Sequence, residues 1–269
     1  MPARLSIGSE SGGGGTVTGV PVRTRNCVIA GLAGSGIQQE NVANAAVTSW
    51  MAVAPADMPG WHRDFVDNFD GPLNTAVWAR YVGGARTGGS LSSYDINNVY
   101  TSSGQLVVRT HQTDGVWTSG GMSSGRCFNV AQGKWSLKAR FDRAYGIGYV
   151  FVLYPQGGGW PPEIDIAPQV MSTLHWDPDN KRKSFFKTGI DMTQWHTYGV
   201  IMNGDAISYT VDGAVWSSFS SYGVPKIPMW FGVQAGAKDC AQSTNECTTS
   251  ATILDSGIYV DWIAHWSAA

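Results

Sequence analysis

Short apolar runs separated by turn signals, from residue 61 onward, constrain the fold of this 269-residue chain more than any other feature. A strand followed by a glycine-rich turn recurs about every ten residues, a spacing typical of β-sandwiches, and no helical period persists after residue 60. The 34 glycines suit tight turns, and the 12 tryptophans suit strands. We therefore predict an all-β fold of two packed sheets. The expected strands lie at 65–71, 99–101, 105–110, 133–141, 149–154, 163–166, 172–176, 195–202, 206–211, 228–235 and 258–266.

The first sixty residues differ in composition from the rest. Residues 1–20 are rich in glycine and serine, including an unbroken glycine run at 12–15, which predicts a flexible tail. Residues 41–53 have a composition compatible with a helix, so residues 21–60 form either a small packed arm or a linker. We divide the chain into a tail and small N-terminal arm, 1–60, and a main domain, 61–269.

Charge and hydropathy exclude several classes of partner. The formal net charge is −2 and only 14% of residues are charged, which gives no basic surface for nucleic acid. The sequence has no run of 18 apolar residues, so we expect no membrane-spanning helix. Its N-terminus has no charged region followed by an apolar stretch, so we expect no signal peptide. The many aromatic residues either fill a large core or stack on sugar rings. Oligomeric state is not predicted.

The four cysteines are Cys27, Cys127, Cys240 and Cys247. Cys240 and Cys247 bracket a polar loop that a disulfide could close. Free thiols with an accidental pair are an equally acceptable interpretation. A zinc site is not expected because no C-x-x-C pair is present.

One expected strand carries two acidic residues. Glu163 and Asp165 alternate with Ile164 and Ile166, so the two carboxylates share one face of the strand and the isoleucines share the other. Like charges this close push their pKa values apart, which is a common way to prepare carboxylates for catalysis. This pair is the candidate catalytic site.

Six segments resemble, in order, the conserved motifs of family 16 of the glycoside hydrolases, the laminarinase, lichenase and agarase group. The resemblance covers about three quarters of the chain, residues 65–266. The segments are 68–71 with Trp78, 118–124 with 132–135, Glu163–Ile166, 195–200, 209–213 and 259–262. It implies a β-jelly-roll sandwich of two antiparallel sheets, concanavalin-like, with a glycan-binding cleft on its concave face.

The resemblance implies a retaining endo-β-glycanase acting on β-glucan or a bacterial exopolysaccharide, similar to endo-β-1,3- or β-1,3-1,4-glucanases. Such enzymes use two carboxyl groups about 5–5.5 Å apart, one as nucleophile and one as acid/base. Glu163 occupies the nucleophile position. Asp165 occupies the position of the residue that hydrogen-bonds and tunes the nucleophile.

The chain departs from the family pattern at the acid/base. The family places a second glutamate where this chain has Ala167 or Pro168, and neither can donate a proton. Gln169 has the right strand parity but is expected to bond a sugar or to be structural. His175 is the best substitute proton donor, and its alternative role is substrate binding. Loss of a general acid costs about 10²–10⁴-fold in rate.

Further roles follow from the resemblance. Trp160 matches a tryptophan of the cleft and either stacks on a sugar or packs in the core. Gln234 replaces an asparagine that lines the cleft. Asp261 matches a residue that often ligates a structural calcium, together with backbone oxygens near Asn68 and Gly71. No cofactor is required for the expected reaction.

Two other functions remain open at this stage. The protein could bind a glycan without cutting it, because the acid is missing. The N-terminal arm could dock the domain onto a surface or viral tail assembly. All three functions predict a polysaccharide partner and an extracellular or surface-associated location.

Overall fold

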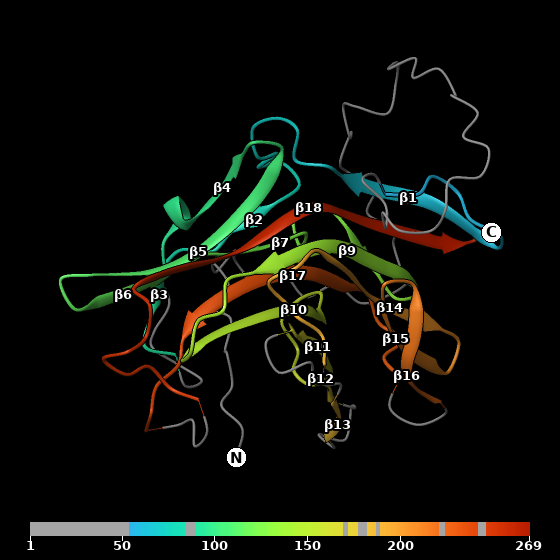
Figure 1. Ribbon diagram of the computed structural model, residues 1–269. Coiled ribbons are helices and arrows are strands. Elements are labelled where there is room, and N and C mark those ends of the chain that lie inside the picture. The colour runs from blue at the N-terminus through green and yellow to red at the C-terminus, as the bar shows by residue number, and fades with distance from the viewer. Residues whose placement is uncertain are drawn as a thin grey trace.

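The computed structural model describes residues 54–83, 90–168, 172–176, 182–186, 189–220, 224–241 and 246–269, with 172–176 and 182–186 described by their backbone. Across these ranges the chain forms two β-sheets, and a short 3₁₀ turn, η1 (Ile96–Asn98), precedes β4 (Val99–Ser102). Figure 1 shows the two sheets layered one above the other. No helix in the described ranges is long and apolar enough to cross a membrane.

The larger sheet has ten strands within the described residues, and its centre is a long strand near the C-terminus. Its members are β1 (Trp61–Asp67), β3 (Ser93–Tyr94), β4 (Val99–Ser102), β5 (Gln105–Thr113), β6 (Val116–Ser119), β9 (Gly133–Phe141), β14 (His196–Asn203), β15 (Ala206–Val211), β16 (Ala214–Ser220) and β18 (Asp255–Ala268). The order is β16-β15-β14-β9-β18-β5-β6-β3, with β1 paired to β18 and β4 to β5. The β3–β6 pair is parallel, and the other pairs are antiparallel.

The smaller sheet has eight strands within the described residues, all in antiparallel pairs. Its members are β2 (Ala79–Arg80), β7 (Gly121–Ser123), β8 (Asn129–Val130), β10 (Ile147–Pro155), β11 (Glu163–Ala167), β12 (Ser172–Trp176), β13 (Arg182–Phe186) and β17 (Met229–Ala237). The order is β13-β12-β11-β10-β17-β7-β2, with β8 paired to β17. The expected two-sheet sandwich is confirmed.

A continuous aromatic core joins the two sheets. Trp135 on β9 stacks on Phe231 of β17 with 4.8 Å between ring centroids, and Phe151 of β10 stacks on Phe231 in turn. All three side chains are at most 2% exposed. Burying a large apolar side chain of this kind contributes about 1.5–3 kcal/mol, so these rings hold the sheets face to face.

Three hairpins of the larger sheet close through two-residue turns in which both residues have positive φ. The pairs are Ser103–Gly104, Asp114–Gly115 and Asp212–Gly213. Such turns match the twist of antiparallel strands, and they favour glycine at the second position. The expected hairpin around residues 102–104 is therefore confirmed.

The first strand differs from the expected 65–71. β1 begins at Trp61 and ends at Asp67. Beyond it the backbone N–H of Phe69 donates to Asp67 Oδ1 at 2.9 Å, and Phe69 adopts a φ of 56°. A side-chain acceptor two residues back offers the backbone an alternative to strand pairing, so the Asp67 carboxylate ends β1.

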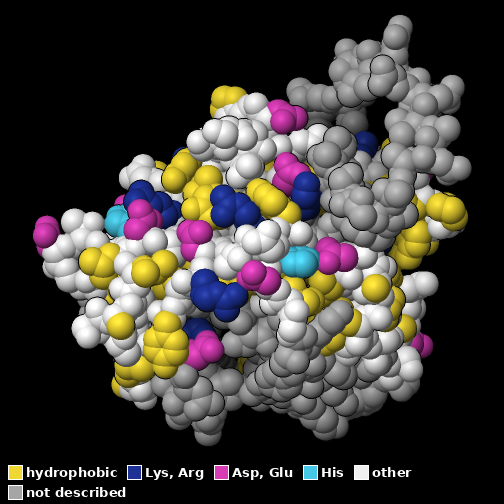
Figure 2. Space-filling view, viewed as in Figure 1, with side chains coloured by type: hydrophobic (Ala, Val, Ile, Leu, Met, Phe, Trp, Pro, Cys, Tyr) yellow, Lys and Arg dark blue, Asp and Glu magenta, His cyan; other side chains and the backbone are white. Residues whose placement is uncertain are grey.

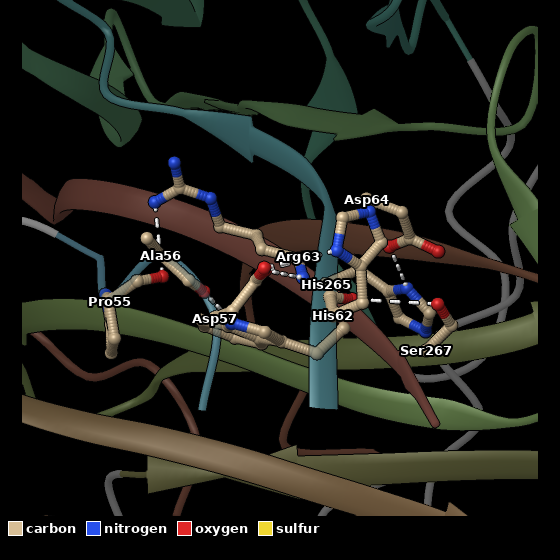
Figure 3. A network of polar contacts seen from close by, with 9 residues as sticks. Pro55, Ala56, Asp57, His62, Arg63, Asp64, His265 and Ser267 are labelled. Atoms are coloured by element: carbon tan, nitrogen blue, oxygen red, sulfur yellow. Dashed lines mark hydrogen bonds and ion pairs between the residues drawn. The ribbon is translucent and has the colours of Figure 1, made fainter. Parts of the chain in front are cut away.

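Residues 54–60 pack onto the larger sheet at the β1 end and cover a second, small apolar cluster. Trp262 and Trp266 lie in this cluster with Ala54, and the Trp266 indole N–H donates to the Ala56 carbonyl at 2.7 Å. Figure 3 shows the neighbouring contact in which Arg63 donates to the carbonyl of Pro55. Arg63 also donates to the carbonyl of Ala54 at 2.8 Å. Residues 1–53, including Cys27 and the expected tail and helix, lie outside the described residues, so the division at residue 60 stays a prediction.

Candidate active site

β11 brings the two acidic residues to the outward face of the smaller sheet. Ile164 and Ile166 point into the core and are at most 6% exposed. Because side chains alternate along a strand, Glu163 and Asp165 point away from the core together. Glu163 is partly exposed, whereas Asp165 is 7% exposed. The sheet thus places one carboxyl where a ligand can reach it and buries the other beside it.

The surroundings of Asp165 favour the protonated form of its carboxyl. Burial raises the pKa of its carboxyl well above the usual range, and the negative charge of Glu163 and a side-chain hydrogen bond between the two raise it further. Two carboxyls that interact this strongly settle into one protonated and one ionised group. Asp165 is the more buried member, so burial favours the proton on Asp165 and the negative charge on Glu163.

Trp160 supplies a second hydrogen-bond donor to Glu163. Its indole N–H donates to Glu163 Oε2 at 2.7 Å. Hydrogen bonds to a charged acceptor are stronger than neutral ones and fix its direction. The structure therefore brings Trp160, Glu163 and Asp165 together, with the indole and the protonated carboxyl both directed at one carboxylate.

An aromatic pair beside Glu163 was missed by sequence reasoning. Leu153 of β10 is the register partner of Ile164, so Tyr154 is level with Glu163 on the outward face. Tyr154 is in turn the register partner of Trp230, and their rings lie 5.3 Å apart. The alternation of side chains along β17 could have indicated this position. Phe231 belongs to the core, so the preceding residue, Trp230, points to the outward face.

Gln234 also lies on the outward face of β17 but is covered. Its side chain is 1% exposed, and its carboxamide oxygen accepts from the Tyr94 hydroxyl at 3.1 Å. Burial raises the pKa of Tyr94, which keeps that hydroxyl a donor. Gln234 thus supports the floor of the sheet near the Ala167 end of β11, and a contact with substrate stays a prediction.

Neither residue at the Ala167 end of β11 that replaces the family's second glutamate, Ala167 or Pro168, carries an acidic proton. Ala167 is the register partner of Ser172, and Pro168 follows directly after the strand. His175 is the register partner of Ile164, whereas the partners of Glu163 and Asp165 are Trp176 and Leu174. Gln169 lies outside the described residues. Acid or binding roles for His175 and Gln169 therefore stay predictions.

The structure does not confirm a calcium ion at Asp261. Lys138 Nζ lies 2.8 Å from Asp261 Oδ2, so the carboxylate already has a cation. Asn68 Oδ1 is buried and unbonded, but it is one oxygen where calcium takes six to eight. Among the described residues, no group of three or more His, Cys, Asp or Glu could hold a metal.

The chain matches the family model "Glycosyl hydrolases family 16" over residues 89–262. A curated relative, the endo-1,3-1,4-β-glycanase ExsH of Rhizobium meliloti (strain 1021), is 28% identical over 107 residues. That match covers 36% of this chain and 23% of the relative, so the chain spans about a quarter of the relative's length.

Solved structures share the fold at low sequence identity. The catalytic domain of an endo-1,3-β-glucanase (laminarinase) from Thermotoga petrophila RKU-1 is 16% identical with a TM-score of 0.65, covering 77% of this chain and 98% of its own. The Bacillus licheniformis β-glucanase is 17% identical with a TM-score of 0.66, covering 75% and 96%. With the family model spanning more than half of the sequence, this chain belongs to family 16 of the glycosyl hydrolases.

Proposed function

We propose that this chain is an endo-acting glycoside hydrolase that cleaves β-linked polysaccharide with retention of configuration, and that Glu163 is its nucleophile. The observation that carries the proposal is the arrangement around Glu163. Its carboxylate is partly exposed on a sheet face and accepts the Trp160 indole N–H at 2.7 Å, and it lies beside Asp165, whose pKa is raised by burial and by the charge of Glu163. Two donors aim the carboxylate, and its negative charge makes it the nucleophile of the pair.

In the first step, an oxygen of Glu163 attacks the anomeric carbon and the bond to the leaving oxygen breaks with its electron pair. The leaving oxygen takes a proton, and a glycosyl ester on Glu163 remains. In the second step, water attacks the same carbon, loses a proton and releases Glu163 as a carboxylate. Asp165 is a positioning residue in this scheme, because its proton bonds the nucleophile.

The site lacks the usual carboxylic acid that would give a proton to the leaving oxygen. Ala167 and Pro168 carry none, and a general acid is worth about 10²–10⁴-fold. His175 and Gln169 are the candidates that the sequence supplies nearby. The enzyme should therefore depend strongly on leaving-group quality: it should cleave aryl glycosides readily and polymer slowly.

The names of the relatives guide the choice of substrate. The curated relative is a 1,3-1,4-β-glycanase and the solved structure from Thermotoga petrophila is a laminarinase. We propose a β-1,3-glucan, a mixed-linkage β-glucan or a bacterial exopolysaccharide as the polymer. Loops set the sugar preference in such folds.

A second candidate function is glycan binding without cleavage, alone or as part of a surface or viral tail assembly. The absence of a carboxyl at Ala167 and Pro168 favours it. The presence of a carboxylate with two hydrogen-bond donors favours hydrolysis instead, because binding a neutral glycan does not require a buried acid beside that carboxylate.

We also propose an extracellular or surface-associated location. Cys240 and Cys247 form a disulfide, with 4.8 Å between their Cα atoms, and Cys127 is disulfide-bonded as well. Disulfides persist in oxidising compartments, and a polysaccharide substrate would be met there.

The test compares two substrates and two proteins. The wild type and Glu163→Gln are assayed on two substrates, 2,4-dinitrophenyl β-laminaribioside and laminarin. The anomer of the sugar product that forms first is followed by NMR. We expect the wild type to release dinitrophenol and β-anomer, and Glu163→Gln to lose on the order of 10³-fold or more. Bound laminarin with no turnover of either substrate would establish the binding function instead.

A further inference from the structure

A pocket lies at the end of the sandwich, away from the acidic pair. It has a volume of about 530 Å³, within the roughly 300–1,000 Å³ typical of ligand sites. The β5–β6 hairpin and the segment 248–254 form its walls. The residues that shape it are Leu91, Gln112, Trp117, Thr249, Ser250 and Leu254.

One wall continues the core face of the larger sheet. Gln112 and Trp117 are register partners on β5 and β6, so their side chains lie on the same face. That face also carries Val108 and Thr110, which are fully buried. The pocket therefore lies at the edge of the core face of the larger sheet, next to buried core residues.

The other wall is held rigidly. Thr248 N donates to the Lys238 carbonyl at 3.1 Å, directly after the Cys240–Cys247 disulfide. The Thr252 hydroxyl accepts from Thr249 N at 2.8 Å, which closes a tight turn. Gln112 N donates to the Leu254 carbonyl and ties the two walls together. A pocket with fixed walls loses little conformational entropy when it binds a ligand.

The chemistry of the lining selects a neutral, hydroxylated ligand. No lining residue is ionisable. Gln112 and Ser250 line the pocket, and the side chain of neither makes a hydrogen bond with a residue in the described ranges. Trp117 and the 55% exposed Leu254 supply apolar surface. Apolar faces combined with an unused amide and hydroxyl match the two sides of a pyranose ring.

We propose that this pocket is a second glycan-binding site that holds a neutral sugar of the same polysaccharide. The identity of the ligand rests on the proposed function, whereas the site itself rests on the pocket. Leu91 N donates to the Ala237 carbonyl, so the pocket lies at the Ala237 end of β17. Trp230, which is level with Glu163, lies seven residues away, or roughly 24 Å at about 3.4 Å per residue. The site would grip the polymer at a distance from the reacting bond.

The experiment follows ¹⁵N-labelled Glu163→Gln protein, in which turnover is blocked, during titration with laminaripentaose. We expect the Gln112 side-chain amide and the Gly115 backbone amide to shift together, in addition to the Trp160 indole signal near Glu163. Ser250→Trp places a ring in the pocket and should abolish the first set of shifts while leaving the Trp160 shift intact. Val215→Trp, on an exposed position of β16, is the matched control and should change neither.

Quantitative binding separates this inference from the proposed function. Calorimetry should give two laminaripentaose molecules bound per chain in Glu163→Gln. It should give one molecule per chain in the double variant Glu163→Gln with Ser250→Trp. Gln112→Ala should weaken the second site up to about tenfold, the worth of one hydrogen bond. One sugar per chain with an unmoved Gln112 amide would overturn the second site, even if hydrolysis is found. Two sugars per chain without hydrolysis would sustain it while the proposed chemistry failed.

Discussion

Asp165 and Asp261 are both largely covered aspartates on strands, but they have opposite neighbours. Asp165, on the outward face of the smaller sheet, is 7% exposed and lies beside another carboxyl, Glu163. Asp261, on the larger sheet, has a 26% exposed side chain and lies 2.8 Å from the ammonium of Lys138. Figure 2 shows Lys and Arg side chains interleaved with acidic and hydrophobic ones on one side of the molecule.

The difference separates a functional charge from a structural one. A buried acid beside a like charge lowers the stability of the fold, so a role in function is the better explanation for its presence. An acid paired with a lysine has its charge compensated. Lys138 Nζ also lies 5.6 Å from the centre of the Trp195 ring, which holds the ammonium in place. The comparison predicts that changes near Asp165 alter chemistry, and that changes near Asp261 alter stability.

The largest expected effect is on turnover, at Trp160. Trp160→Phe keeps an aromatic ring at this position but removes the indole N–H that donates to Glu163. A hydrogen bond to a charged group is worth about 1.5–3 kcal/mol, so kcat on the aryl glycoside should fall about 10- to 150-fold. Trp195→Phe, at the Lys138 site, is the control and should leave kcat unchanged. Equal kcat values for the two variants would break the comparison.

The next effect is on stability, at Lys138. Lys138→Met leaves Asp261 without its cation, and because both side chains are partly exposed the expected cost is about 1–3 kcal/mol. Urea unfolding measures it. Adding Asp261→Asn should recover part of the loss, because the uncompensated charge is then gone. A double variant that is less stable than the sum of the two single ones would contradict the pairing.

A smaller effect of opposite sign is expected at Asp165. Its pKa is raised in the folded state, so its favourable contribution is present at low pH and is lost as pH rises through the folded pKa. Asp165→Asn cannot ionise, so the free energy of unfolding should exceed that of the wild type above the raised pKa and approach it below pH 4. Denaturant curves from pH 4 to pH 9 would show this, and parallel pH profiles would refute it.

The smallest effect is expected from calcium. Because Lys138 already neutralises Asp261, adding millimolar CaCl₂ or EGTA should shift the Tm of the wild type by less than about 1 °C, well below the 2–4 °C that accompanies 1 kcal/mol in a domain of this size. A rise of several degrees with calcium would show that a metal competes with the lysine.

Local rules made much of this protein predictable from its sequence. β9 and β12 lie at the predicted residues, and the β4–β5 hairpin closes at the predicted turn. Alternation alone placed Glu163 and Asp165 on one face of β11. These features depend on neighbours within a few residues, so periodicity and turn chemistry are sufficient to find them.

Other features depend on residues that are distant in the sequence and meet only in the fold. Lys138 and Asp261 are 123 residues apart, and Tyr94 and Gln234 are 140 apart. The pocket between β5, β6 and the segment 248–254 likewise joins two ends of the main domain. The sequence by itself determined the strands, the turns and which side chains share a face, because those follow from backbone geometry. The tertiary structure decided which charges meet a compensating partner and how deeply each is buried, because strand pairing and sheet packing bring distant residues together and set the burial that gives these charges their energy.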